Sequence, residues 1–145
     1  MNTKDKYSRI KAMGIFQHGG KTLASRCYDS KKDQHFYRLL GGSLFEQEYA
    51  VDAIHREIME ELGSEIENVV LHGVCENIFT YEGEPGDEVV FMYTADLANK
   101  EIYQKNEFPI LDHPDGILEW IPVEDVLSGE KILYPEYDYS CVFNK

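Results

Sequence analysis

Four charged side chains fall within a short stretch near the middle of the chain: Arg56, Glu57, Glu60 and Glu61. On a helix the three carboxylates share one turn, where like charges repel one another by roughly 0.2–0.5 kcal/mol per pair. A divalent cation removes that repulsion, because magnesium prefers carboxylate oxygens and leaves coordination positions for water and phosphate. Arg56 can hydrogen-bond a carboxylate and fix its orientation. These residues therefore permit a metal site for phosphate chemistry, although an acidic triplet alone is more typical of a solvated helix face.

The segment that must position these glutamates is predicted to be an amphipathic helix from Glu48 to Leu62. It contains neither glycine nor proline, and Gly63 directly after it is a typical helix terminator. Apolar residues recur at spacings of three and four and form one stripe that faces the core: Val51, Ile54, Ile58 and Leu62. The glutamates are expected on the edge of the helix beside that stripe.

A wider pattern surrounds this helix. Gly42 is followed after five residues by Glu48, and after seven more by the run from Arg56 to Gly63. The stretch from Gly42 to Ser64 resembles the Nudix box, the pattern G-x5-E-x7-R-E-U-x-E-E-x-G-U, in which U is a bulky aliphatic residue. Every fixed position matches, and Ile58 fits the first aliphatic position. Because this motif is highly specific for the Nudix hydrolase family, the resemblance predicts a reaction class.

The sequence departs from the usual family pattern at three positions. Ser64 stands where the box ends on an aliphatic residue, so one packing contact after the helix is lost or supplied by another residue. In the loop before the helix, Phe45 replaces a frequent glutamate and Gln47 replaces a frequent glycine. The acidic core of the box is intact, whereas the conformation of this loop is not predicted.

The resemblance implies a role for each charged residue of the box. Glu57, Glu60 and Glu61 would bind magnesium or manganese ions, and the carbonyl of Gly41 and the carboxylate of Glu48 would add ligands. Bound metal would lower the pKa of a water and neutralise charge on the reacting phosphorus. The residues to which the resemblance assigns catalysis are Arg56, which would orient Glu57, and Glu57, Glu60 and Glu61.

The general base is left open between two places in the chain. In some family members it is a glutamate of the box, which here indicates Glu57. In others it is an acidic residue of a loop distant in sequence, which here indicates Asp112 or Asp115. The segment 111–116 that holds both aspartates contains proline and glycine, so ordinary turn chemistry is the simpler explanation of these two residues.

Strands are predicted on both sides of the central helix. They span 9–16 and 21–28 around a Gly19-Gly20 hairpin turn, 35–40 before Gly41-Gly42, 69–81 and 88–97 around a turn at 83–87, and 117–121, with a second helix at 123–127. This order predicts an α+β fold in one domain over residues 1–145. The resemblance specifies a Nudix-type α/β/α sandwich with a mixed β-sheet. The four aromatic residues of the tail 134–145 are expected in core or dimer packing, and stacking on a nucleotide base is the alternative.

Composition excludes several other functions. The chain has 27 acidic and 14 basic residues and a net charge of −13, so no surface for extended nucleic acid is expected. No apolar run approaches the roughly 18 residues of a membrane span, and no signal peptide is recognised, so no membrane partner is expected. Three cysteines (Cys27, Cys75 and Cys141) lie in no metal-binding spacing and are expected to be free thiols of a cytoplasmic protein.

The expected function is metal-dependent hydrolysis of a diphosphate (pyrophosphate) bond in a nucleoside diphosphate linked to another moiety, a small soluble nucleotide. No residue pattern selects one substrate. A catalytically silent Nudix-fold module that binds nucleotides or regulates is the first alternative, and an unrelated domain with an acidic helix is the second. Dimerisation is common in the family, and the sequence neither requires nor excludes a homodimer.

Overall fold

The computed structural model describes residues 8–143, and the strands in this range form two sheets. The first sheet has the spatial order β5 (Leu40–Ser43), β1 (Arg9–Ile15), β7 (Glu84–Leu97) and β6 (Ile66–Tyr81). Strand β1 runs parallel to β7 and antiparallel to β5, so this sheet is mixed. It carries the glycines that lead into the helix of the Nudix-like pattern.

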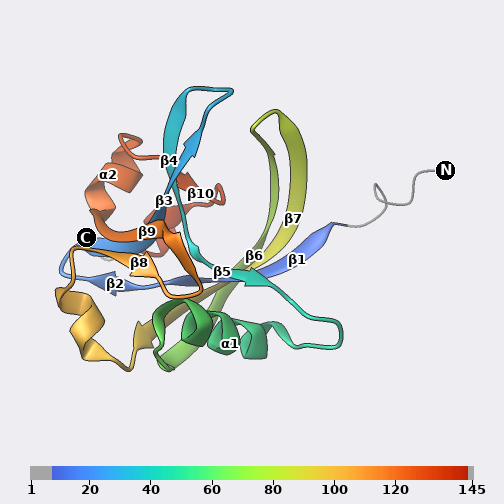
Figure 1. The fold of residues 1–145 in the computed structure, drawn as a ribbon. Coiled ribbons are helices and arrows are strands. Elements are labelled where there is room, and N and C mark those ends of the chain that lie inside the picture. Colours follow the sequence, from blue (N-terminus) through green and yellow to red (C-terminus); the bar gives the residue numbers. More distant parts are fainter. Residues whose placement is uncertain (1–7, 144–145) are drawn as a thin grey trace.

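The second sheet is mostly antiparallel. Its order is β10 (Leu133–Tyr134), β4 (Gln34–Arg38), β3 (Lys21–Asp29), β9 (His113–Pro122) and β8 (Glu107–Ile110), with β2 (Gln17–His18) pairing with β3. The pairing of β10 with β4 is parallel. The β3–β4 and β6–β7 hairpins project from the sheets on the side away from the long helix, as Figure 1 shows.

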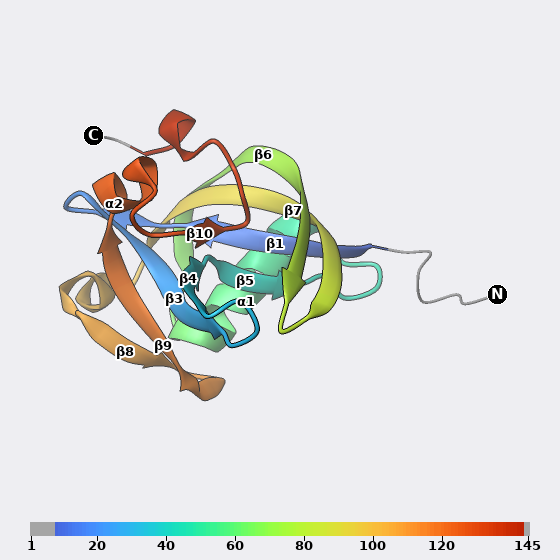
Figure 2. The ribbon, with the colours of Figure 1, turned by 90° about the horizontal axis from the view of Figure 1, so that it is seen from above.

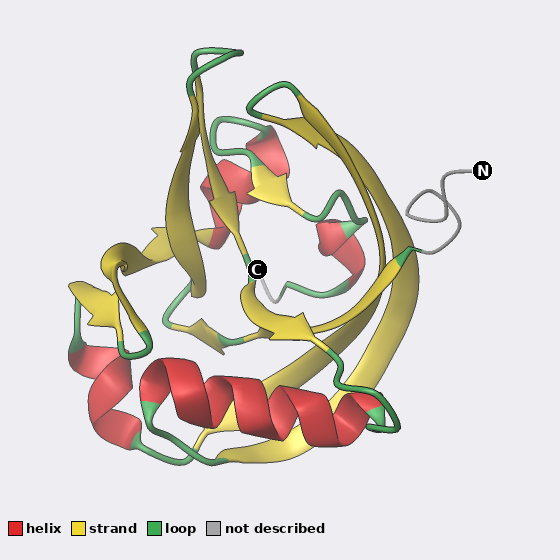
Figure 3. Ribbon diagram, turned by 45° about the vertical axis from the view of Figure 1, so that its right-hand side comes forward, coloured by secondary structure: helices red, strands yellow, loops and turns green. Residues whose placement is uncertain are grey.

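Two helices lie on opposite sides of the sheets (Figures 1 and 3). Helix α1 (Ala50–Leu62) packs on β5 and β1, and α2 (Val123–Ser128) follows β9 directly. Strand β1 supplies both cores because its side chains alternate: Ala12 joins the cluster under α1, whereas Met13 and Ile15 join the cluster with Val123 of α2. The predicted α+β sandwich with mixed sheet pairing is therefore confirmed.

The predicted hairpin over 9–28 is wrong in its pairing. Only Gln17 and His18 pair with β3 across the Gly19-Gly20 turn, whereas β1 belongs to the first sheet. The chain changes sheets at Phe16, whose carbonyl accepts hydrogen bonds from the backbone N–H of Leu23 and the hydroxyl of Thr22. Parallel pairing of β1 with the distant β7 gives β1 its place, and no local pattern encodes that contact.

The predicted strand 35–40 is likewise divided between the two sheets. Strand β4 ends at Arg38, Leu39 is buried, and β5 begins at Leu40 in the first sheet. Gly41 and Gly42 therefore lie inside β5 and do not terminate a strand. At Gly41 the backbone has φ 144°, and a Cβ would lie 2.0 Å from the carbonyl oxygen of Ala12, so glycine is required there.

The predicted helix is confirmed with two corrections. It begins at Ala50, because Tyr49 is extended and Gln47 has φ 62°, so Glu48 lies in the preceding loop. Within the apolar stripe, Val51 is exposed and Ala53 is buried in its place. Gly63 ends the helix in the left-handed conformation, and its N–H donates to the carbonyl of Met59 at 2.9 Å, as a C-terminal glycine should.

Other elements extend the predicted strands. The second hairpin turns at Glu82 and Gly83, both with positive φ, so residues 84–87 belong to β7 and not to the turn. Strand β9 begins at His113, earlier than predicted, and helix α2 is confirmed at 123–128. Strand β8 and the 3₁₀ helix Lys100–Gln104 were not predicted.

The aromatic tail closes the second core. Strand β10 is followed by the 3₁₀ helix Tyr139–Cys141, and the side chains of Tyr139 and Phe143 are buried against the cluster that contains Met13. Core packing, one of the two expectations for the tail, is therefore confirmed for these two residues. Between residues 8 and 143, no helix is long and apolar enough to cross a membrane.

Candidate active site

Arg56 is the centre of the charged cluster on α1. Its guanidinium holds Glu48 through two hydrogen bonds of 2.9 Å, and it also donates to Glu57 at 2.8 Å and to Glu60 at 3.4 Å. A fifth hydrogen bond, of 3.1 Å, reaches the carbonyl oxygen of Ser43 in β5. Arg56 therefore brings together residues from the strand, the loop and the helix.

The loop before α1 is fixed by the same guanidinium. The Phe45 ring stacks on it with 3.7 Å between the guanidinium carbon and the ring centroid. Glu48 also accepts a hydrogen bond from the backbone N–H of Phe45, so the hydrogen bonds from Arg56 and then Phe45 lower the pKa of Glu48 to about 2. The phenylalanine that departs from the usual family pattern thus supports the arginine.

Gly41 and Gly42 form the wall that faces the glutamates. The backbone N–H of Gly41 donates to Glu61 at 3.0 Å. A Cβ on Gly42 would lie 2.5 Å from the Glu57 carboxylate, so only glycine leaves that carboxylate its present position. Strand β5 and helix α1 therefore lie so close together that the Glu57 carboxylate packs against Gly42 and the Glu61 carboxylate is hydrogen-bonded to Gly41.

Glu61 is the most perturbed acid of the cluster. Burial is the largest cause, followed by the charges of Glu57 and Asp112, and together they raise the pKa of Glu61 to about 8. The charge of Arg38 and the N–H of Gly41 oppose this rise. A half-buried carboxyl beside a second carboxylate is in the environment that a bound cation would stabilise.

Asp112 reaches this cluster through the end of the helix. The backbone N–H of Leu111 donates to the carbonyl oxygen of Glu61 at 2.9 Å and fixes the neighbouring turn. The other candidate base, Asp115, is exposed on β9. The predicted loop 111–116 is therefore a short turn followed by strand, and Asp112 is the aspartate whose charge acts on Glu61.

Ser64 forms two hydrogen bonds at the end of the box. It is 2% exposed, and its hydroxyl donates to the carbonyl of Glu65 and accepts from the backbone N–H of Asn99. An aliphatic residue would make neither bond. The serine thus ties the helix terminus to the segment after β7, and hydrogen bonds replace the missing packing contact.

The donor set fits a divalent cation, although the side chains lie in an arrangement held by Arg56. In the described range, no three acidic, histidine or cysteine side chains already surround one metal position. In each of Glu57, Glu60 and Glu61, however, only Oε1 accepts a hydrogen bond from another described residue, and Oε2 accepts none. A carboxylate oxygen on each of three neighbouring glutamates is the ligand chemistry that magnesium and manganese prefer.

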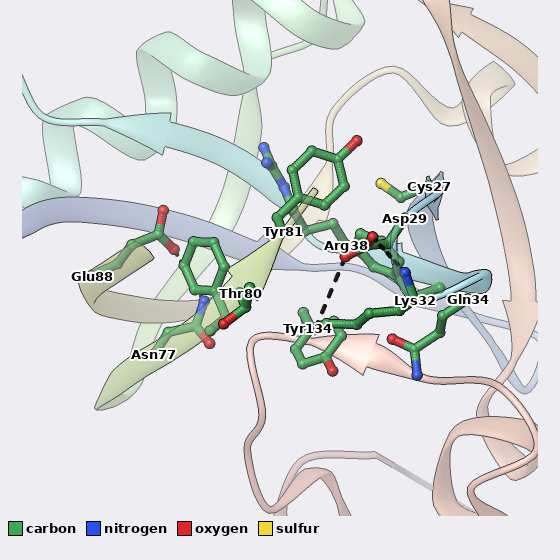
Figure 4. A pocket seen from close by; sticks show the side chains of 12 residues that line it. Cys27, Asp29, Lys32, Gln34, Arg38, Asn77, Thr80, Tyr81, Glu88 and Tyr134 are labelled. Carbon is green, nitrogen blue, oxygen red and sulfur yellow. Dashed lines mark hydrogen bonds and ion pairs between the residues drawn. The ribbon is translucent and has the colours of Figure 1, made fainter. Parts of the chain in front are cut away.

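A pocket of about 180 Å³ opens between the two sheets (Figure 4). Its polar floor contains the buried Asn77, which donates to Glu88 at 3.1 Å, and Lys11 forms an ion pair of 2.9 Å with Glu88. Aromatic side chains supply much of the remaining wall: Phe36, Phe79, Tyr81 and Tyr134. The pocket is suited to a flat ring with polar groups on its edge.

The charged residues of the box lie close together, as predicted, whereas no pattern in the sequence predicted this pocket. The structure joins Arg56 to Glu48, Glu57 and Glu60, and joins the N–H of Gly41 to Glu61. Metal binding by these residues stays a prediction. Most residues that line the pocket come from two hairpins far apart in the chain, β3–β4 and β6–β7. The ribbons of these hairpins are seen from above in Figure 2. Asn77, Phe79 and Tyr81 stand at alternate positions in the sequence, and this spacing by itself indicates only a strand.

Comparison with known proteins agrees with this architecture. Residues 9–139 match the NUDIX domain family, so the chain belongs to the Nudix family. Nudix hydrolases act on pyrophosphate bonds, and they generally use a divalent metal and small nucleotide-like substrates. The chain is a Nudix hydrolase by this membership. Comparison with curated protein sequences gives no match.

Solved structures show the same fold at low sequence identity. A NUDIX hydrolase from Nitrosomonas europaea is 15% identical with a TM-score of 0.63, and the match covers 94% of this chain and 86% of that one. A MutT NUDIX hydrolase from Burkholderia pseudomallei is 22% identical with a TM-score of 0.55, over 81% and 85% of the two chains. The mMutator MutT protein from Bacillus halodurans is 20% identical with a TM-score of 0.57, over 88% and 75%.

Proposed function

We propose that this protein hydrolyses the diphosphate bond of a small, soluble nucleotide-like molecule and depends on magnesium or manganese for turnover. The observation that carries the proposal is the arrangement of Glu57, Glu60 and Glu61 on one turn of α1. Each has a carboxylate oxygen without a hydrogen-bond partner among residues 8–143, and the turn faces the glycines of β5. Carboxylates at this spacing repel one another by roughly 0.2–0.5 kcal/mol per pair, and a cation removes that repulsion.

The side chains of the box have separate tasks in this proposal. Glu57, Glu60 and Glu61 hold the metal, with the carbonyl of Gly41 and the carboxylate of Glu48 as further ligands. A divalent metal at this position neutralises charge that develops on phosphorus and lowers the pKa of the attacking water. Arg56 holds Glu57 in place through its 2.8 Å hydrogen bond, whereas its bond to Glu60 is longer, at 3.4 Å.

Two acids are candidates for the general base. Glu57 lies against Gly42 within the cluster, and Asp112 lies near enough to raise the pKa of Glu61. Asp115 lies three residues further along the chain and is exposed on β9, so we rank it behind these two. Separate Glu57→Gln, Asp112→Asn and Asp115→Asn variants should identify the base, because a base works only when deprotonated and its loss removes the acidic limb of the pH–rate profile.

The nucleotide-like character of the substrate is inferred from the pocket and the charge. Aromatic walls and a buried amide suit a heterocyclic ring, and a volume of about 180 Å³ suits a single ring system. The net charge of −13 disfavours a long polyanion. The three cysteines are free, which supports the prediction of a reducing compartment such as the cytoplasm. A homodimer stays a prediction.

A panel of nucleoside triphosphates, nucleotide sugars and dinucleoside polyphosphates tests this proposal, with products identified by mass spectrometry. Wild-type protein should release a phosphorylated product with magnesium and none with excess chelator. Glu60→Gln should lose most turnover, whereas Glu130→Gln, the same change at an exposed site beyond α2, should keep it. If no compound is cleaved but several bind, the protein is a silent nucleotide-binding module.

A further inference from the structure

The four arginines of this chain differ in whether a carboxylate binds them. Arg26 is held by Glu119 and Glu107, and Arg56 is held by the glutamates of the box. In the described range, Arg9 and Arg38 have neither an ion pair nor a side-chain hydrogen bond. In an acidic protein with 27 carboxylate side chains, two unpaired guanidinium groups require an explanation.

Both unpaired arginines lie at the same opening. Arg38, at the end of β4, lines the pocket between the sheets, where Figure 4 shows it with Tyr81. With Arg9 and Lys11 of β1, it also lines the hollow outside that pocket. The hollow is lined by Glu84 and Asp87 as well, and neither acid has formed an ion pair with either arginine. Carboxylates are therefore available nearby, and the guanidinium groups still remain unpaired.

Arg38 connects this opening to the metal-binding glutamates. It stands three residues before Gly41, whose N–H donates to Glu61 at 3.0 Å, so the chain passes from Arg38 directly to the wall that holds this carboxylate. Lys11 is not equivalent, because its charge is balanced by Glu88 at 2.9 Å. Arg38 is thus the unpaired cation placed between the proposed metal site and the pocket for the organic group.

A guanidinium group suits a phosphate better than an ammonium group does, because its planar fork donates two parallel hydrogen bonds to two oxygens. We propose that Arg38 is a substrate-binding residue that holds the phosphate chain between the metal-binding glutamates and the pocket, with Arg9 reinforcing the field at the opening. This inference rests on the proposed function and adds a phosphate-binding residue from outside the box. The alternative explanation is an ordinary exposed arginine without a ligand.

Kinetics with a substrate from the panel provide the first test. Arg38→Gln should raise KM by about tenfold to a hundredfold, the loss expected for charged hydrogen bonds, while kcat changes less. Arg38→Lys should recover part of that loss, because it restores the charge but not the fork. Lys21→Gln, which removes one positive charge from an exposed residue at the far end of β3, is the control and should match wild type. Equal KM values for Arg38→Gln and Lys21→Gln would overturn the proposal.

Binding of inorganic pyrophosphate separates this inference from the proposed function. Isothermal titration calorimetry with magnesium should show pyrophosphate binding to wild type and Lys21→Gln, and about tenfold or weaker binding to Arg38→Gln. If wild type binds pyrophosphate through Arg38 but cleaves nothing in the panel, the proposed function fails and this inference stands. If the panel is cleaved and Arg38→Gln binds pyrophosphate as wild type does, the inference fails and the function stands. Absence of pyrophosphate binding by wild type also contradicts it.

Discussion

Glu61→Gln should make the metal-free protein more stable at alkaline pH. Burial and the charges of Glu57 and Asp112 raise the pKa of Glu61 from its ordinary value of 4.5 to about 8. A carboxyl group with a raised pKa binds its proton more tightly in the folded chain than in the unfolded one. Its contribution to the free energy of unfolding is therefore fully present below pH 4.5 and is lost as the pH rises through about 8. Glutamine cannot ionise, so it avoids this loss.

The size of the effect follows from the two pKa values. Each pH unit between them changes the free energy of unfolding by about 1.4 kcal/mol, which sets a limit of about 5 kcal/mol above pH 8. Glu61 keeps some contact with solvent, and its charged form can turn towards water, so we expect about 2–4 kcal/mol at pH 9. The amide oxygen of glutamine can still accept the hydrogen bond from Gly41 that Glu61 accepts now.

Urea unfolding with excess chelator from pH 5 to pH 9 measures this difference. Glu61→Gln should match wild type near pH 5 and exceed it at pH 9. Glu60→Gln is the matched control, because Glu60 lies on the same turn with a side chain that is 43% exposed, and its pH dependence should follow wild type. If Glu61→Gln is no more stable than Glu60→Gln at pH 9, the reasoning about burial of Glu61 is refuted.

Three further changes test the site. Gly42→Ala should change the free energy of unfolding by no more than about 1 kcal/mol but reduce turnover by about 10- to 100-fold, because its Cβ displaces the movable Glu57 carboxylate. Urea unfolding measures the first effect and kinetics the second. Gly41→Ala should instead destabilise the fold by about 3 kcal/mol, since its Cβ would meet the backbone of Ala12, and an unchanged urea midpoint would contradict the expected clash. Arg56→Lys should lower turnover by about tenfold and loosen the loop at Phe45, because lysine cannot make the forked bonds to Glu48; limited proteolysis and kinetics report both effects.

The helix and its acids could be predicted because their determinants are local. The apolar spacing and Gly63 place α1 to within two residues of its observed start, and the fixed spacing from Gly42 to Gly63 assigns the charged residues to one cluster. Val51 was wrongly predicted to face the core, for a simple reason. The sheet covers the side of the helix occupied by Ala53, and periodicity cannot specify which edge of an apolar stripe the sheet reaches.

The sheets could not be assembled from local patterns. Strand β1 pairs in parallel with β7, which lies more than 70 residues later in the chain, and the sequence near Arg9–Ile15 contains no trace of that partner. At Phe16 and Leu39 the chain changes from one sheet to the other, but neither change is marked by a turn residue in the sequence. Long-range contacts decide both places, so the pocket and the position of Arg38 became visible only in the folded structure.

These features of the fold also suggest why the site is divided into two parts. Regular elements hold the side proposed to bind metal: β5 and α1 meet through glycine, and Ser64 and Leu111 anchor the end of the helix. Hairpin tips supply the other side, where Phe79 and Tyr81 line the pocket. Changes in the hairpins can thus alter the proposed binding pocket without disturbing the acids that are proposed to bind metal.

Hydrolysis in ¹⁸O-labelled water tests the central claim most directly. With a cleaved substrate and magnesium, mass spectrometry should find one ¹⁸O atom in a phosphate of the product, because water attacks phosphorus. The label should disappear with excess chelator and fall to a small remainder in Glu60→Gln, while Glu130→Gln incorporates it at the wild-type rate. Incorporation that is independent of metal, or that survives in Glu60→Gln at the wild-type rate, would contradict the assignment of the α1 glutamates to metal-dependent diphosphate hydrolysis.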